Sequence, residues 1–301
     1  MRLPASAEED RYSNRTNPLG ELQLSGSIAL YRNPSRQVAA AIQSFLSCSL
    51  NASLTVVDNS PDDSLRTTVE ANGAEYIFNG NNIGFGAAHN IAIRKYQNLS
   101  EYHLVLNPDV TFCQDTIPKL LRFMLRNPSI GLVMPEVLYP DMRKQRLCKL
   151  LPAPVDLFIR RFGRGALQKS ARERMARYLL EDMDLTSPRF VPNLSGCFMF
   201  VRMEALRMVG VFDERYFLYL EDVDLCRRIA ERWDTVFYPD AKIIHEYGNG
   251  SYRDALHLKL HTISAIKYFN KWGWFRDPLR NVLNARTFDT TRFYVEPDDA
   301  E

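Results

Sequence analysis

The sequence lacks the features that would place it in several common protein classes. Its five cysteines (Cys48, Cys113, Cys148, Cys197 and Cys226) include no CxxC pair and are odd in number. This argues against a disulfide framework or a structural zinc site, so we expect reduced thiols in a cytosolic chain. No run of about 18 uncharged apolar residues is present, so no membrane span is predicted. The N-terminus has no apolar core and does not resemble a secretory signal.

Large net charge and glycine-rich nucleotide fingerprints are also missing. The net charge is +2, which gives no overall attraction to nucleic acid. The GxGxxG spacing is absent, which weakens the case for a NAD-dependent oxidoreductase. Nucleotidyltransferases carry a glycine-rich basic motif after the first strand, whereas this chain has Tyr31-Arg32-Asn33-Pro34 there. What remains is an ordinary globular composition, 46% hydrophobic and 25% charged over 301 residues.

Short apolar runs alternate with helical patterns along most of the chain. Runs at 27–31, 54–57 and 102–106 predict buried strands, and the spacing at 35–46 and 87–96 predicts helices. This alternation predicts an α/β fold with a Rossmann-like, mostly parallel sheet and helices on both faces. Further strands are expected at 75–78, 131–134, 196–202, 235–238 and 242–245.

Composition also suggests how the chain is divided. Residues 1–25 are polar and are expected to form a disordered arm, followed by one domain over 26–252. Residues 142–188 are expected to be a basic, mobile insertion, because 142–178 hold 11 Lys/Arg against two acids. Residues 253–301 should form a helical segment that is amphipathic and aromatic.

Polar residues follow several of the predicted strands. Asp58 follows one strand, Asn107-Pro108-Asp109 another, and the loop 82–86 (Asn-Ile-Gly-Phe-Gly) precedes a helix. In a parallel sheet, strand ends of this kind converge on one ligand crevice. Each of these motifs has a plainer interpretation as turn chemistry. Asn90, one turn into the helix, could reach the crevice or face solvent.

The most specific signal is the acidic stretch 221–224 (Glu-Asp-Val-Asp) at the start of a helical pattern. One acid would suffice to cap a helix, and three exceed that need. A carboxylate at a helix N-terminus stays ionised, which suits a general base. His245 closes a later strand and could bind a metal or be structural.

Together these residues resemble the family 2 glycosyltransferases of the GT-A fold, and above all the rhamnosyltransferase-like branch that builds bacterial surface polysaccharides. The resemblance covers about residues 27–255, and its specificity lies in the order of six blocks. These blocks are 57–60, 82–86 with Asn90, 106–110, 196–199, 212–214 through 222–226, and His245 with Gly248 and Ser251.

The resemblance implies a role for each matched residue. Asp58 would bind the nucleobase or ribose. Asp109 would be the last acid of a metal-binding DxD motif in which Asn107 replaces the first acid. Mg²⁺ or Mn²⁺ would bridge the donor diphosphate, with His245 as a further ligand. Asp222 would deprotonate the acceptor hydroxyl, with Glu221 and Asp224 orienting that site, while Gly196 and Cys197 would line the donor sugar and the acceptor entry. The remaining donor-site residues would be Tyr31, Asn33, Asn82, Gly84, Phe85, Asn90 and Asn107.

The resemblance further implies an inverting transferase in surface polysaccharide synthesis. Its donor would be a nucleotide diphosphate sugar, dTDP-rhamnose or a UDP-sugar, and its acceptor a polyprenyl-diphosphate-linked saccharide or an oligosaccharide. The basic stretch 142–178 and the aromatic segment 254–285 predict peripheral contact with the inner face of the cytoplasmic membrane. The alternatives are a solvated basic face and a helix docked on the core. A non-catalytic nucleotide-sugar-binding scaffold is a rival interpretation, but Asp222, Asp109 and His245 are all present.

Overall fold

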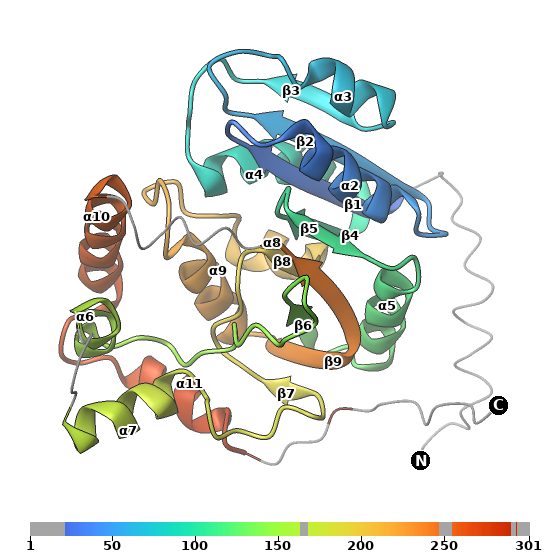
Figure 1. Cartoon of the computed structure of the whole chain (residues 1–301). Helices are drawn as coiled ribbons and strands as arrows, with labels where there is room; N and C mark the ends of the chain where they lie inside the picture. Colours follow the sequence, from blue (N-terminus) through green and yellow to red (C-terminus); the bar gives the residue numbers. More distant parts are fainter. Residues whose placement is uncertain (1–21, 163–167, 247–254, 290–292, 294–301) are drawn as a thin grey trace, which may run out of the picture.

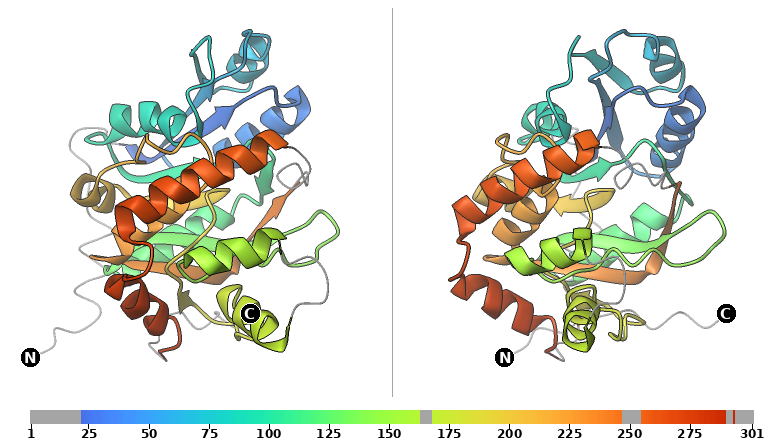
Figure 2. Two further views of the ribbon diagram at one scale, coloured as in Figure 1. Left: turned by 90° about the vertical axis from the view of Figure 1, so that its left-hand side faces the viewer. Right: turned by 60° about the vertical axis from the view of Figure 1, so that its left-hand side comes forward.

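Strands and helices alternate through the first half of the chain, as predicted (Figure 1). The computed structural model describes residues 22–162, 168–246, 255–289 and 293. The elements of this half are β1 (Leu22–Leu30), α2 (Ser35–Leu46), β2 (Ala52–Asp58), α3 (Arg66–Ala71), β3 (Glu75–Phe78), α4 (Phe85–Tyr96) and β4 (Ser100–Leu106). Figure 2 shows α2 and α4 on opposite faces of the strands between them.

The second half adds more helices. Its elements are β5 (Val110–Phe112), α5 (Thr116–Arg126), β6 (Ile130–Leu138), α6 (Pro154–Phe162), α7 (Lys169–Tyr178), β7 (Arg189–Phe190), β8 (Phe198–Arg202), α8 (Met203–Val209), α9 (Glu221–Ala230), β9 (Asp234–His245), α10 (Ala255–Trp272) and α11 (Pro278–Arg286). The two strands expected at 235–238 and 242–245 are one strand, β9, whose pairing with β6 shifts register between Pro135 and Glu136.

In the described part of the chain, nine strands join one sheet in the order β3-β2-β1-β4-β8-β6-β9-β5, with β7 beside β9. The first four strands in this order run parallel, as predicted. The rest of the sheet is mixed: β6 and β9 run parallel, whereas β8 runs antiparallel to β4 and β6, and β5 and β7 run antiparallel to β9. Strands buried on both faces look alike in sequence whichever way they run, so the sequence did not reveal this mixture.

The N-terminal boundary also needs correction. β1 begins at Leu22, so the expected arm 1–25 extends four residues too far. Ser25 already pairs with Ser53 of β2 and His103 of β4. Residues 1–21 lie outside the described part of the chain, as do Gly248 and Ser251 of the family resemblance.

The described parts of the stretch expected to be a mobile insertion, 142–162 and 168–188, are instead folded against the domain. They contain α6 and α7, and Leu150, Leu151 and Leu157 are buried. Lys149 forms an isolated bridge with Asn193, so the stretch touches the sheet region without adding a strand over 142–178. The apolar residues interleaved with its basic side chains provide the burial that orders it.

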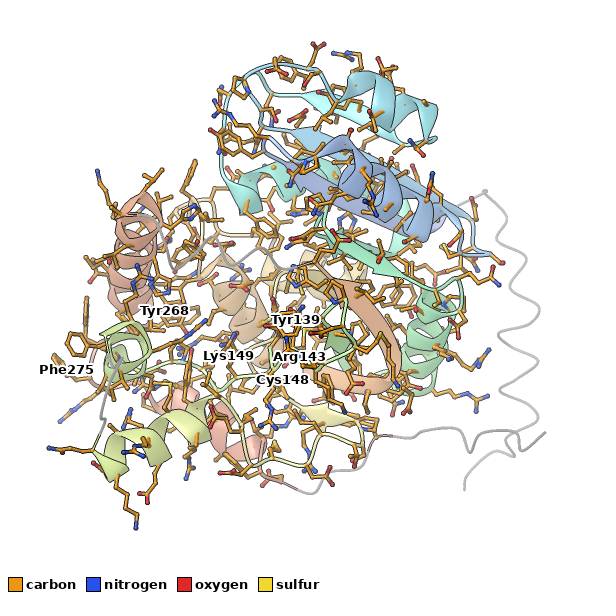
Figure 3. All side chains as sticks on the ribbon, viewed as in Figure 1. Tyr139, Arg143, Cys148, Lys149, Tyr268 and Phe275 are labelled. Carbon is orange, nitrogen blue, oxygen red and sulfur yellow. The ribbon has the colours of Figure 1, made fainter. Side chains whose placement is uncertain are left out.

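The C-terminal helices α10 and α11 dock on α9, which agrees with the alternative of a docked segment. Arg227, whose side chain is 2% exposed, donates two hydrogen bonds of 2.6 Å to the Asp277 carboxylate at the start of α11. Its guanidinium also lies 4.1 Å from the ring centroid of Trp272. Figure 3 shows Tyr268 inside this interface, whereas Phe275 points away from the body of the protein. Among the described residues, no helix combines the length and apolarity needed to cross a membrane.

Candidate active site

The sheet brings the predicted strand-end residues to one edge. β1, β2 and β4 are neighbours and run parallel, with Leu30 opposite Asp58 and Ile28 opposite Leu106. Tyr31, Asp58 and Asn107 therefore leave the sheet side by side, as the sequence predicted. Tyr31 is 48% exposed, and its backbone N–H donates to the Asn33 side chain at 2.8 Å, which orders the turn after β1.

Asp58 organises the turn that follows β2. Its carboxylate accepts the Ser60 N–H at 2.8 Å and the Tyr76 hydroxyl at 2.7 Å, and the residue is 0% exposed. The turn chemistry considered as an alternative is thus present, with Tyr76 as a partner that sequence analysis missed. The role of Asp58 in binding a nucleobase or ribose remains a prediction, because its side chain is enclosed here.

Hydrogen bonds of three asparagine side chains connect this edge of the sheet to the glycine loop. Asn79 donates to Asn59 at 2.7 Å, and Asn59 donates to the Gly84 carbonyl at 3.2 Å. The Asn82 side chain accepts the Gly84 N–H at 3.0 Å. Gly84 has a φ of +94°, and a Cβ there would lie 2.5 Å from the Phe217 carbonyl oxygen. Only glycine fits this close crossing of two backbones.

Asn90 is better explained by a structural role than by donor binding. It is 0% exposed, its amide oxygen accepts the Phe212 N–H at 3.0 Å, and its NH₂ group donates to the Phe212 carbonyl and to Glu214, each at 2.9 Å. These bonds use both ends of the amide. Asn90 therefore fixes the segment that leads to the acidic stretch, and the crevice lies elsewhere.

Asp109 and His245 meet because β5 pairs with β9. Val110 lies opposite His245, and His245 Nε2 lies 3.3 Å from Asp109 Oδ1. Gln145, missed by sequence analysis, fixes the imidazole. Its amide N–H₂ donates to the His245 and Leu138 carbonyls at 2.7 and 3.2 Å, so its oxygen faces His245 Nδ1 at 3.1 Å. Nδ1–H is then the donor, and the Nε2 lone pair faces the carboxylate.

This pair fits a divalent cation. Two acceptors 3.3 Å apart need a proton or a cation between them, and Asp109 Oδ1 is buried and accepts no hydrogen bond in the described structure. The described residues contain no group of three or more His, Cys, Asp or Glu side chains arranged to hold a metal. Mg²⁺ and its analogues commonly take only one or two protein ligands, with substrate phosphates and water completing the shell.

The acidic stretch begins from strained backbone. Tyr219 and Leu220, neither of them glycine, have φ of +72° and +66° immediately before α9. Such conformations cost on the order of 1–3 kcal/mol each and cluster at functional sites. Tyr219 is held by its hydroxyl, which lies 2.8 Å from His257 Nδ1 of α10.

Asp222 stands at the N-terminus of α9 against Gly196. Its Oδ2 accepts the Gly196 N–H at 3.0 Å, and Oδ1 accepts the Val223 N–H at 2.8 Å. A Cβ on Gly196 would lie 3.2 Å from Asp222 Cβ, so glycine permits this approach. The next residue, Cys197, accepts the Asn107 N–H at 2.9 Å through its carbonyl. Gly196 and Cys197 therefore connect the acidic stretch to the turn at Asn107.

Glu221 is a buried neighbour of Asp222. It is 4% exposed, its Oε2 has no hydrogen-bond partner in the described structure, and burial together with the Asp222 charge raises its pKa well above the ordinary value. A raised pKa favours a neutral Glu221 beside Asp222.

Asp224 does not face the site, which corrects the expectation that it orients the sugar or acceptor. Two residues on from Asp222, it points to the other side of the helix. It is 0% exposed and binds Arg228 at 2.8 Å, Lys271 at 2.7 Å and the Trp272 Nε1–H at 2.8 Å. Asp224 is therefore an anchor for α10.

A cavity of about 490 Å³ lies beside the acidic stretch, and neither Asp58 nor Asp109 is among its lining residues. Glu221 and Asp222 line it from α9, His245 from β9 together with its partner Gln145, and His261 from α10. The grouping of basic side chains on one wall of this cavity was not predicted from the sequence, because these side chains come from the stretch expected to be mobile. The wall consists of Arg146, Lys149, Arg160 and Arg161.

Comparison with known proteins identifies the family. The family model described as glycosyl transferase family 2 matches residues 28–210. The chain belongs to glycosyl transferase family 2. The match covers the strand-end edge, the Asp109 motif and Gly196, and it ends before α9.

Two curated relatives of this family 2 glycosyltransferase are named rhamnosyltransferases. An N-acetylglucosaminyl-diphospho-decaprenol L-rhamnosyltransferase of Mycobacterium tuberculosis is 32% identical over 68% of this chain and 70% of its own. Rhamnosyltransferase WbbL of Escherichia coli is 27% identical over 75% of this chain and 81% of its own.

Solved structures confirm the fold of this family 2 glycosyltransferase as that of GT-A enzymes. GalNAc-T7, solved with UDP, GalNAc and Mn²⁺, aligns with a TM-score of 0.58 at 12% identity, over 84% of this chain and 48% of that chain. This chain thus spans about half of that one. Mannosyltransferase PcManGT from Pyrobaculum calidifontis, solved with GDP-Man and Mn²⁺, aligns with a TM-score of 0.54 at 15% identity, over 93% of this chain and 79% of that one.

Proposed function

We propose that this glycosyltransferase moves a deoxysugar, rhamnose, from a nucleotide diphosphate to a lipid-linked saccharide with inversion at the anomeric carbon. The observation that carries the proposal is the placement of Asp222, a helix N-terminal carboxylate fixed by Gly196, in the same cavity as His245, which lies 3.3 Å from Asp109. The names of the two relatives support rhamnose as the sugar and, in one case, a decaprenyl-diphosphate acceptor. The donor nucleotide is dTDP or UDP.

The donor half of the site lies at the ends of β1, β2 and β4. Asp109 Oδ1 and His245 Nε2 would hold Mg²⁺ or Mn²⁺ together with the donor diphosphate, and both solved neighbours were obtained with Mn²⁺. When bound, the cation neutralises the charge that develops on the diphosphate leaving group. Gly84 brings backbone close to the donor, and the Asp58 turn closes the nucleoside end.

Asp222 acts as the general base. It accepts the proton of the acceptor hydroxyl while the hydroxyl oxygen bonds to the anomeric carbon and the bond to the diphosphate breaks on the opposite face. One carboxylate suffices for a single displacement, whereas retaining glycosidases use a second carboxylate as nucleophile. Glu221 stays neutral through its raised pKa, so it does not compete for the proton. A scaffold role is not favoured, because Asp222 and His245 line one cavity and Asp109 lies 3.3 Å from His245.

The proposed location is the inner face of the cytoplasmic membrane, where a lipid-linked acceptor is presented. Large apolar side chains remain exposed on α6, on α11 and in the segment between α10 and α11. Phe158 is 63%, Phe275 93% and Val282 64% exposed. Apolar side chains flanked by Lys and Arg favour an anionic lipid surface. Flotation with anionic vesicles at low salt tests this, and a protein that stays wholly unbound would exclude it.

The donor proposal is tested by thermal shift with nucleotide diphosphates and nucleotide sugars, with and without Mn²⁺ or Mg²⁺. A ligand at about 100 times its dissociation constant stabilises the fold by roughly 2.7 kcal/mol. We expect a metal-dependent rise in Tm with dTDP or UDP species and a loss of that metal dependence in His245→Ala. A rise in Tm that is the same in the presence of EDTA would contradict the metal assignment. Incubation of the protein with dTDP-rhamnose and a lipid-diphosphate saccharide would test transfer directly.

A further inference from the structure

We propose that Lys149 and Arg160 form a subsite for the diphosphate group of the lipid-linked acceptor. This inference rests on the proposed function and extends it to the binding of the acceptor. The subsite lies in the same cavity as Asp222, on the wall built from the 139–149 segment and α6. Figure 3 labels Lys149 beside Cys148, and Figure 2 shows α6 lying near α10 on one side of the molecule.

Among the described residues, the Lys149 ammonium has no ion-pair partner. Its backbone N–H donates to the Asn193 carbonyl at 3.1 Å, which fixes the start of the side chain. In the part of the chain that the structure describes, no hydrogen bond or ion pair is recorded for its ammonium group. Burial, reinforced by the Arg160 charge, lowers its pKa to about 8, although Asp222 opposes this shift. A half-buried ammonium of this kind is stabilised by a bound anion.

The remaining wall of the cavity adds positive charge. Arg160 hydrogen-bonds the Tyr178 hydroxyl, which orients the guanidinium. Burial and the charges of Arg160 and Arg161 lower the pKa of His261 on α10 to about 4, so these arginines lie close to the α10 side of the cavity. Against these cations the cavity offers Asp222, while the raised pKa of Glu221 favours its neutral form. A diphosphate would bring negative charge to this wall, and Lys and Arg are the side chains that bind phosphate best.

The position of this wall favours the acceptor over the donor. Donor diphosphate is assigned to Asp109 and His245 at the β5–β9 pair, whereas α6 and α10 lie on the other side of α9 in Figure 1. Apolar side chains are exposed on both α6 and α10, including Phe158 and Ile263, which are 63% and 38% exposed. A polyprenyl chain leaving the diphosphate would therefore meet an apolar surface on its way to the membrane.

The kinetics of the Lys149→Gln variant distinguishes binding of the acceptor diphosphate from binding of the donor diphosphate. The acceptors are a short polyprenyl-diphosphate-linked N-acetylglucosamine and an alkyl glycoside of the same sugar without phosphate. We expect KM for the diphosphate acceptor to rise about tenfold or more, as for the loss of one hydrogen bond to a charged group. KM for the alkyl glycoside and for the donor should stay unchanged, and Lys149→Arg should restore most of the loss. Arg143→Gln is the matched control, because Arg143 belongs to the same segment, pairs with Asp141 and lies outside the cavity lining.

Two kinetic outcomes would overturn the inference. A higher KM for the donor would assign Lys149 to the donor diphosphate, and an equal rise for both acceptors would make its role structural. Binding of inorganic pyrophosphate to the intact protein in EDTA, measured by calorimetry, gives a readout that needs no transfer activity. We expect binding to wild type and at least tenfold weaker binding to Lys149→Gln. If the wild-type protein transfers no sugar but binds pyrophosphate more tightly than Lys149→Gln, the proposed function fails and the anion subsite stands. If the two proteins bind pyrophosphate with equal affinity, the subsite is excluded.

Discussion

Replacing Asp222 with asparagine should remove the base while preserving the shape of the site. The carboxylate accepts two backbone N–H groups, from Gly196 at 3.0 Å and Val223 at 2.8 Å. An asparagine has one carbonyl oxygen and can keep only one of these bonds. The loss of one hydrogen bond costs about 1 kcal/mol of stability, so Tm should fall by only a few degrees.

The chemical effect should be much larger. A positioned general base contributes about 10²- to 10⁴-fold to the rate, and an amide cannot accept the acceptor proton. We therefore expect kcat to fall by about 10²- to 10⁴-fold. Donor affinity should remain within about twofold of wild type, because the base contributes to the transition state and not to ground-state binding of the donor. The assay is the initial rate of nucleotide diphosphate release at saturating donor and acceptor, with the donor Kd measured separately.

Asp224→Asn is the matched control, since it changes the same atom on the same helix. Asp224 is 0% exposed and binds Arg228, Lys271 and the Trp272 indole, so its neutralisation leaves buried cations poorly paired. We expect it to cost roughly 3 kcal/mol or more of stability and to lower Tm clearly, with activity retained at temperatures where the variant is folded. If Asp222→Asn keeps kcat within threefold of wild type, or if it loses donor affinity instead, the assignment of the base is wrong.

Three further predictions concern the glycine loop, the metal-binding pair and buried histidines. Gly84→Ala places a Cβ 2.5 Å from the Phe217 oxygen at a φ of +94°, so thermal unfolding should show a loss of at least about 1–3 kcal/mol. Gln145→Leu removes the hydrogen bond that fixes His245, and isothermal titration with Mn²⁺ and nucleotide diphosphate should show about 10- to 100-fold weaker metal binding. His89 and His103 are 0% exposed and their pKa values are lowered to about 3, by burial above all. The unfolded chain then binds more protons than the folded chain between pH 6.5 and 3, so the free energy of unfolding should fall as pH falls through this range. Urea unfolding should show a loss of up to about 1.4 kcal/mol per pH unit for each histidine. A flat profile from pH 6.5 to 5 would contradict the neutral state of the two imidazoles.

Much of the donor edge could be predicted from the sequence because strand order constrains it. Asp58 and Asn107 follow apolar runs, and the carboxyl ends of neighbouring parallel strands must lie side by side. The acidic stretch was also visible, because three carboxylates exceed what a helix cap needs. The opposite directions of Asp222 and Asp224 follow from helical geometry, since two residues on a helix are about 200° apart.

Other features depended on contacts between distant segments. The antiparallel β5–β9 pairing brings Asp109 to His245, and Gln145 reaches the imidazole across a hundred residues of sequence. No local pattern encodes such pairings, because strands buried on both faces read the same in either direction. The basic stretch 142–188 looked unstructured for a related reason. Its helices gain their burial only from partners elsewhere in the chain.

The sequence by itself determined the alternation of elements, the chemistry available at each strand end and the family. Local periodicity and turn residues carry that information, because they depend on neighbours a few positions away. The tertiary structure alone decided that Asp224 anchors α10, that the C-terminal helices dock on α9 through Arg227 and Asp277, and that Lys149 lines the cavity with no ion-pair partner among the described residues. These outcomes depend on which faces pack together and on what solvent they exclude, and only the folded chain brings those faces into contact.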